Sequence, residues 1–339
     1  MRNVIELQKK LLPDLLDVMK KRYRILQYLR LRQPVGRRTL ARSLDLSERV
    51  LRSEVMFLKE QNLVHIGSGG MTLTEGGENL LEGLEEVMKD VSGLSDMESQ
   101  LASELNVQQA IIVSGNSDRY SWVKKEMGRA CVRQMKEQLE PQDVVAVAGG
   151  TTLAAVAEMM SPDDNVSSVS FVPARGGLGE KVEIQSNTIS STMAQKAHGN
   201  YRLLHVPDQL SDETRESLVL EPGIKELLHL IRQAKMVIHG VGEAETMAAR
   251  RKTKAETLES LKDKQAVAEA FGYYFDRTGC IVHKENTIGL QLDDLSSNQV
   301  VMTVAGGASK AEAITAYMKY RPSDVLITDE GAAQAMLRK

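Results

Sequence analysis

From about residue 107 onward, short apolar runs rich in β-branched residues alternate with helix-like stretches, and this alternation constrains the fold most strongly. The strand-like runs are residues 110–113, 144–148, 169–172, 203–206, 236–239, 300–305 and 325–328. Amphipathic stretches such as 122–139, 223–233 and 311–319 separate many of them. Such alternation predicts an α/β fold, a doubly wound and mostly parallel sheet with helices on both faces. Ligands of such sheets bind beyond the carboxyl ends of the strands.

Glycine pairs follow three of these predicted strands. Gly149-Gly150 and Gly306-Gly307 each lead from a strand toward a helix, and Gly176-Gly177 follows Arg175. Glycine lets backbone N–H groups approach an anion, and a helix N-terminus adds partial positive charge. The side chains that add phosphate donors beside these pairs are Thr151, Thr152, Arg175 and Lys310. Although a single glycine pair is usually a tight turn, the combination predicts a site for a small phosphorylated metabolite.

Other ligand classes lack their motifs. GxxxxGK[ST] does not occur, and Glu245 stands where the third glycine of GxGxxG would follow Gly240-Val241-Gly242. Cys131 and Cys280 are isolated, and the six histidines show no metal-ligand spacing, so we expect no cofactor and no metal. The chain contains no apolar run of the roughly 20 residues that a membrane span needs. These features predict a cytoplasmic protein without membrane contact.

The small net charge of −3 conceals an asymmetry along the chain. Residues 1–65 contain 15 lysines and arginines against 7 aspartates and glutamates, whereas the remainder contains 28 against 39. A basic head on an acidic body is typical of a protein whose one end contacts a polyanion.

Within the basic head, residues 37–44 and the Ser47-capped stretch that follows predict two helices joined by a tight turn. Alternating residues around Gly67–Gly70 then predict a β-hairpin, so that residues 1–76 form a winged helix-turn-helix. The polar side chains that we expect to contact double-stranded operator DNA are Arg37, Arg38, Arg49, Arg52 and Ser53. The competing interpretation is a solvated charged face on a protein-binding module.

An amphipathic stretch at 77–93 predicts a connector helix before an effector-binding and oligomerisation domain at 94–339. Its apolar stripe suits either pairing with a second copy or packing on its own chain. Helix-turn-helix proteins commonly read repeated half-sites, which favours a dimer.

Four segments carry a resemblance along essentially the whole chain: Gly36–Leu40 with Ser47–Arg52, Val172–Gly179, Ala270–Phe275 and Thr328–Ala333. With these segments the chain resembles the SorC/DeoR-type family of bacterial sugar-responsive transcription regulators. The resemblance implies an effector domain folded like sugar-phosphate isomerases. It also implies a homodimer, tetrameric on DNA, that represses a glycolytic operon and is relieved by fructose 1,6-bisphosphate or a related sugar phosphate.

The resemblance also implies an effector site formed by Gly149, Gly150, Thr151, Thr152, Arg175, Gln185, Arg250, Arg251, Glu269 and Lys310. From the residues alone, Arg250-Arg251 would be a solvated pair, and Gln185 and Glu269 would be surface groups. The alternative function is a sugar-phosphate isomerase or deaminase with an accessory DNA-binding domain. Because no Asp/His or Asp/Glu cluster suited to proton transfer is evident, we expect no enzyme activity.

Overall fold

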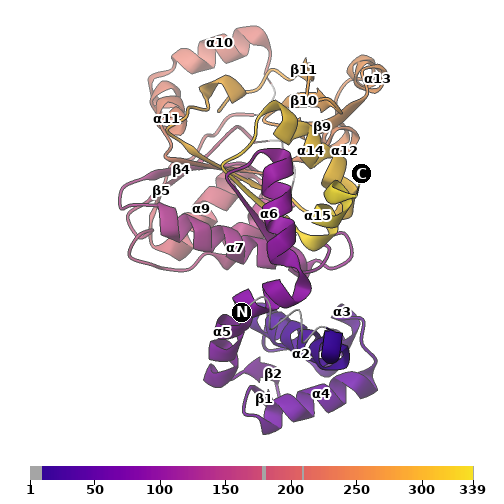
Figure 1. Cartoon of the computed structure of the whole chain (residues 1–339). Coiled ribbons are helices and arrows are strands. Elements are labelled where there is room, and N and C mark those ends of the chain that lie inside the picture. The colour runs from indigo at the N-terminus through magenta and orange to yellow at the C-terminus, as the bar shows by residue number, and fades with distance from the viewer. Residues whose placement is uncertain (1–9, 178–180, 208–209, 339) are drawn as a thin grey trace. The chain divides into compact units, whose positions relative to one another are not determined.

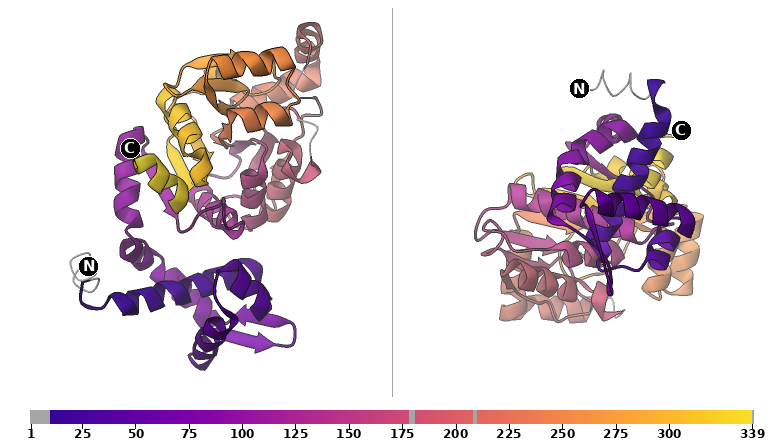
Figure 2. Two further views of the ribbon diagram at one scale, coloured as in Figure 1. Left: turned by 90° about the vertical axis from the view of Figure 1, so that its right-hand side faces the viewer. Right: turned by 90° about the horizontal axis from the view of Figure 1, so that it is seen from below.

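The computed structural model describes residues 10–177, 181–207 and 210–338, which divide into two compact units (Figures 1 and 2). The units are Met1–Asp96 and Met97–Lys339. Part of one resemblance segment, Leu178-Gly179, lies outside the described residues.

The smaller unit is a winged helix-turn-helix, as predicted. Its elements are α2 (Pro13–Arg32), α3 (Arg37–Ser43), α4 (Glu48–Glu60), β1 (Val64–Gly67), β2 (Gly70–Leu73) and α5 (Glu75–Ser92). Ser47 caps α4 by accepting a hydrogen bond from the Val50 amide at 3.3 Å. The apolar face of α4, formed by Leu51, Val55 and Leu58, is buried. The predicted hairpin is the antiparallel pair β1–β2.

Glu54 joins α4 to α2 in this unit. Its carboxylate accepts from Lys21 Nζ at 2.9 Å and from Arg22 Nε at 2.8 Å. Burial acts to raise the pKa of Glu54, but the bonds and charges of Arg22 and Lys21 outweigh it and leave that pKa below its usual value. The Arg22 guanidinium also lies 3.6 Å from the Phe57 ring centroid. These contacts do not involve Arg49 and Arg52, the two exposed arginines of α4.

The connector stretch forms α5, which begins at Glu75 after the Thr74 cap, ends at Ser92 and is followed by Gly93. Gly93 has a φ of 72°, the left-handed conformation common after a helix. A further helix that the sequence analysis did not predict, α6 (Leu94–Leu105), follows directly.

In the larger unit, the described residues contain a seven-stranded sheet in which all neighbours are parallel. In spatial order its strands are β3 (Gln109–Val113), β13 (Val325–Asp329), β12 (Val300–Val304), β7 (Met236–His239), β4 (Val144–Val147), β5 (Ser170–Pro173) and β6 (Asn200–Tyr201). Along the chain, β4, β5 and β6 are added toward one edge of the sheet, whereas β7, β12 and β13 are added toward the other. The switch point of the doubly wound sheet therefore lies between β4 and β7. The predicted doubly wound parallel sheet is therefore confirmed.

Helices alternate with the strands of the larger unit (Figure 1). They are α7 (Trp122–Gln138), α8 (Thr151–Met159), α9 (Ser186–Ala197), α10 (Asp212–Leu220), α11 (Pro222–Arg232), α12 (Ala244–Arg250), α13 (Ala255–Asp263), α14 (Ala311–Tyr320) and α15 (Glu330–Leu337). Met127, Val156 and Met193 from α7, α8 and α9 share one buried cluster with strand residues such as Phe171.

One predicted strand, 203–206, is wrong. The sheet edge is instead β6 at Asn200–Tyr201. The Asn187 side chain bonds both backbone groups of Leu204, accepting from its N–H and donating to its carbonyl at 3.0 Å each. Because the Asn187 side chain satisfies both backbone groups of Leu204, this residue needs no partner in a neighbouring strand.

A second, antiparallel sheet was not predicted. Its strands are β11 (Ile281–Lys284), β10 (Tyr273–Asp276), β9 (Ala266–Ala270) and β8 (Gly242–Glu243). Phe271 (φ 54°) and Gly272 (φ 85°) form the tight turn between β9 and β10. Both turn positions have positive φ, which is usually signalled by Asn-Gly or Asp-Gly rather than Phe-Gly.

Candidate functional site

A pocket lies at the carboxyl ends of β4, β5, β7 and β12, where the strand order of the parallel sheet reverses. We call it the strand-end pocket, and its volume is about 950 Å³ when the open solvent at its mouth is included. Of the predicted effector residues, those that line it are Gly149, Gly150, Thr151, Thr152, Arg175, Gln185, Arg250, Glu269 and Lys310. Arg251 lies behind this lining, with its side chain fully buried. The structure thus brings together residues that are separated by up to 161 positions along the chain.

The turn at Gly149-Gly150 sets the start of α8. Gly150 has a φ of 128°, a conformation that disfavours any residue with a side chain. A Cβ at Gly149 would lie 2.9 Å from the Ile184 carbonyl oxygen. Thr151 and Thr152 begin α8, and the first N–H groups of a helix have no acceptor within it. The loop therefore presents helix amides and hydroxyls at the pocket, as an anion site requires.

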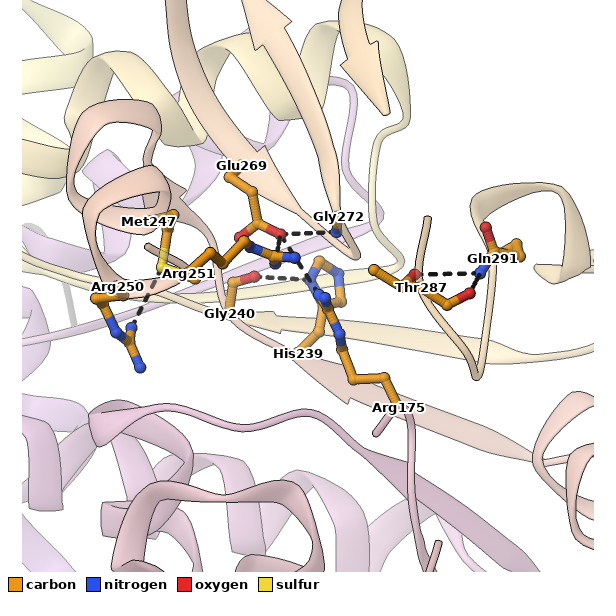
Figure 3. A network of polar contacts seen from close by, with 10 residues as sticks. All are labelled: Arg175, His239, Gly240, Met247, Arg250, Arg251, Glu269, Gly272, Thr287 and Gln291. Atoms are coloured by element: carbon orange, nitrogen blue, oxygen red, sulfur yellow. Dashed lines mark hydrogen bonds and ion pairs between the residues drawn. The ribbon is translucent and has the colours of Figure 1, made fainter. Parts of the chain in front are cut away.

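Glu269 is the centre of a buried ionic cluster (Figure 3). Its Oε1 accepts from Arg251 Nη2 at 2.5 Å, from the Gly272 amide at 2.7 Å and from Arg175 Nη1 at 3.4 Å. All three charged side chains are less than a tenth exposed. One carboxylate oxygen thus binds two guanidinium groups, and charged groups in a buried place depend on partners of opposite charge.

Lys310 and Arg250 are two further cations of the pocket. Lys310 is half-buried at the start of α14, and Arg250 contacts the Met247 sulfur apart from the Glu269 cluster (Figure 3). Burial, together with the charges of Lys124 and Arg250, lowers the pKa of Lys310. A bound anion would reverse this effect by stabilising the charged ammonium.

Two of the three glycine pairs do not act as the sequence analysis predicted. The Gly307 amide donates to Asp329 Oδ2 at 2.8 Å, and the Ser309 amide donates to Asp118 Oδ2 at 2.9 Å. The amides of Gly176 and Gly177 likewise donate to main-chain carbonyls. These loop amides are thus already bonded to carboxylates and carbonyls of the chain itself. From the loop at 306–310, the pocket is lined by Lys310 and not by the glycines.

His239, the last residue of β7, lines the pocket and was missed by the sequence analysis. Its Nδ1 lies 3.0 Å from the Gly240 carbonyl oxygen, and its Nε2 lies 2.8 Å from Thr303 Oγ1. Burial lowers the pKa of His239 to about 4, so the ring is neutral at neutral pH. Its position at the end of a buried strand was a signal that could have identified it.

The five predicted DNA-contacting residues, Arg37, Arg38, Arg49, Arg52 and Ser53, are all exposed. Arg37 and Arg38 begin α3, whereas Arg49, Arg52 and Ser53 lie on α4. Arg38 Nε lies 3.7 Å from Glu48 Oε1. Because both side chains are largely exposed, this ion pair contributes little to stability. The arrangement leaves four guanidinium groups at the surface of the two helices.

In the part of the chain that the structure describes, none of the helices could span a membrane. In the same residues, no three His, Cys, Asp or Glu side chains are grouped as ligands of a metal ion.

Comparisons with known proteins match both units. A family described as a putative sugar-binding domain matches residues 89–338, and one described as the CggR N-terminal DNA binding domain matches residues 18–88. The central glycolytic genes regulator of Priestia megaterium is 60% identical over 339 residues, covering 100% of this chain and 99% of the relative. The protein of the same name from Bacillus subtilis is 57% identical over 338 residues, with the same coverage.

A putative SorC family transcriptional regulator from Enterococcus faecalis, known from its crystal structure, superimposes with a TM-score of 0.68. It is 45% identical and covers 72% of this chain and 100% of its own. The chain belongs to the SorC family. The resemblance found in the sequence is confirmed, and this SorC family member is a DNA-binding transcription regulator with a sugar-binding domain. Its relatives are named as regulators rather than as enzymes.

Proposed function

We propose that this SorC family regulator represses a glycolytic operon, and that fructose 1,6-bisphosphate or a related sugar phosphate relieves the repression by binding in the strand-end pocket. The two relatives that match the whole chain are both named central glycolytic genes regulators, which supports the glycolytic target. Arg37, Arg38, Arg49, Arg52 and Ser53 contact the operator in this proposal.

The observation that carries the proposal is the excess of cations at the pocket. Among the described charged residues that line it, the cations Lys310, Arg250 and Arg175 outnumber the carboxylates Glu243 and Glu269. The start of α8 adds amides and two hydroxyls. Donors on separate loops suit a sugar with a phosphate at each end, and Gln185 adds an amide for the sugar hydroxyls.

Relief of repression requires that the effector prefer one of two states of the protein. A ligand shifts an equilibrium only by its difference in affinity for the two states. In our proposal, the regulator binds repeated half-sites as a homodimer that assembles to a tetramer, and the effector favours an arrangement that binds them less well.

The direct test is a mobility-shift titration on the DNA upstream of the glycolytic genes, with and without fructose 1,6-bisphosphate. We expect retardation of the DNA by the protein alone and weaker or less cooperative retardation with the bisphosphate. Unphosphorylated fructose is the control and should have no effect. Retardation that is identical in all three conditions would contradict the proposed effector.

Replacing Arg52 with alanine should weaken operator binding by about tenfold or more at matched salt. It should also lower the slope of log affinity against log salt by about one if Arg52 holds a phosphate. Lys59→Ala, which removes the same charge from the last turn of α4, is the matched control. Thermal stabilisation by sugar phosphate should be unchanged in both variants. Equal operator affinities of Arg52→Ala and Lys59→Ala would show that Arg52 does not contact the operator.

An isomerase or deaminase remains the second candidate, because His239 and Glu243 both line the pocket and both could transfer protons. Against it, both ring nitrogens of His239 are engaged within the protein. Incubation with fructose phosphates and glucosamine 6-phosphate distinguishes the candidates. Turnover at ordinary enzyme rates, about 1–1000 per second, would favour the enzyme.

A further inference from the structure

Lys124 occupies an electrostatically unfavourable position. It lies in the first turn of α7, where the helix dipole disfavours a cation, and that turn contains no acidic residue. In the described part of the chain, Lys124 forms no ion pair with a carboxylate. Its Nζ donates instead to Thr151 Oγ1 at 3.2 Å. The next residue, Lys125, is paired with Glu158 on α8.

Lys124 thereby reaches the strand-end pocket from outside its lining. Thr151 is the first residue of α8 and lines the pocket. Since the Thr151 oxygen accepts from Lys124, its hydroxyl hydrogen is available to donate toward a ligand. Lys124 therefore supplies a positive charge at the start of α8 and orients a donor there.

A second ammonium group acts on the same region. The charged groups that influence Lys310 are Lys124 from α7, Arg250 from α12, Glu243 from β8 and Asp118 from the loop after β3. Asp118 already accepts from the Ser309 amide and, at 3.1 Å, from the Ser309 hydroxyl. Burial and the charge of Lys124 lower the pKa of Lys310. The two lysines repel each other unless an anion lies between or beside them.

We propose that Lys124 is a further ligand-binding residue of the strand-end pocket, and that with Lys310 it selects a doubly ionised phosphate over a singly charged one. This inference rests on the proposed function. A group with two negative charges gains about twice the Coulomb attraction from each ammonium that a monoanion gains. The second ionisation of a phosphate monoester has a pKa of about 6, so the selection is visible between pH 5 and pH 7.5.

The test measures binding of fructose 1,6-bisphosphate to the full chain by calorimetry, at pH 7.5 and at pH 5. The variants are Lys124→Gln, the charge-retaining Lys124→Arg, and Lys125→Gln as a matched control one residue away. At pH 7.5 we expect Lys124→Gln to bind about tenfold or more weakly than the control, because a charge-assisted bond is lost. At pH 5 the difference should shrink to about threefold, and Lys124→Arg should recover most of the affinity.

The outcomes separate this inference from the proposed function. Equal affinities of Lys124→Gln and Lys125→Gln at both pH values would remove Lys124 from the pocket while leaving the effector proposal intact. If Lys124→Gln loses the same factor in affinity at both pH values, the contribution of Lys124 does not depend on the second phosphate charge, and the proposed selection is overturned. If the wild-type chain binds no fructose 1,6-bisphosphate, the proposed effector fails, and this inference fails with it. Unchanged operator binding by Lys124→Gln is expected and shows that the variant is folded.

Discussion

Replacing Glu269 with glutamine should lower the free energy of unfolding of the larger unit by about 3–5 kcal/mol, the usual cost of breaking a buried ion pair. The substitution keeps the size of the side chain but removes the counterion of Arg175 and Arg251, both of which are less than a tenth exposed. The two buried guanidinium groups would then lose the carboxylate that both of them contact. Urea unfolding of the full chain, followed by circular dichroism, measures the loss.

The control for this prediction is Glu226→Gln. Glu226 pairs with Arg202 at 2.7 Å, but both side chains are largely exposed, so its loss should leave the unfolding midpoint unchanged. If Glu269→Gln unfolds at the same urea concentration as Glu226→Gln, the buried cluster contributes no stability.

Replacing Lys310 with alanine should abolish the response to sugar phosphate while leaving operator binding intact. Lys310 is half-buried at the pocket, and losing its charge-assisted bond to a phosphate should weaken effector binding by about 10- to 100-fold. The winged unit, Met1–Asp96, does not contain Lys310, so DNA affinity without effector should not change. Mobility shifts titrated with fructose 1,6-bisphosphate measure both quantities.

Lys319→Ala provides the comparison for this second experiment. Lys319 lies on the same helix, α14, is exposed, and donates to the Arg277 carbonyl outside the pocket. It should respond to the bisphosphate as the wild type does. An unchanged response of Lys310→Ala would mean that the effector binds elsewhere.

The features that the sequence predicted correctly depend on local patterns. Apolar runs such as 236–239 and 325–328 are strands because a parallel strand buried on both faces needs continuous apolar residues. Ser47 caps α4, and Leu51, Val55 and Leu58 face the core, because helical spacing places them on one side. The failures at 203–206 and at the β9–β10 turn have the opposite origin. The Asn187 side chain, 17 positions away, bonds the backbone of Leu204. Phe271 adopts a positive φ, which its residue type does not predict.

By itself, the amino-acid sequence determined the alternating fold, the basic winged head, and the glycine turn with its two threonines at the start of α8. Only the tertiary structure decided which loops stay open to a ligand. Asp118 and Asp329 accept hydrogen bonds from the amides of Ser309 and Gly307 in the loop at 306–310. Glu269, which the sequence suggests is a surface acid, is buried and contacts both Arg175 and Arg251. The physical reason is that periodicity and capping act between residues a few positions apart. The protonation, burial and availability of a polar group depend instead on partners that only folding brings within 3 Å or so.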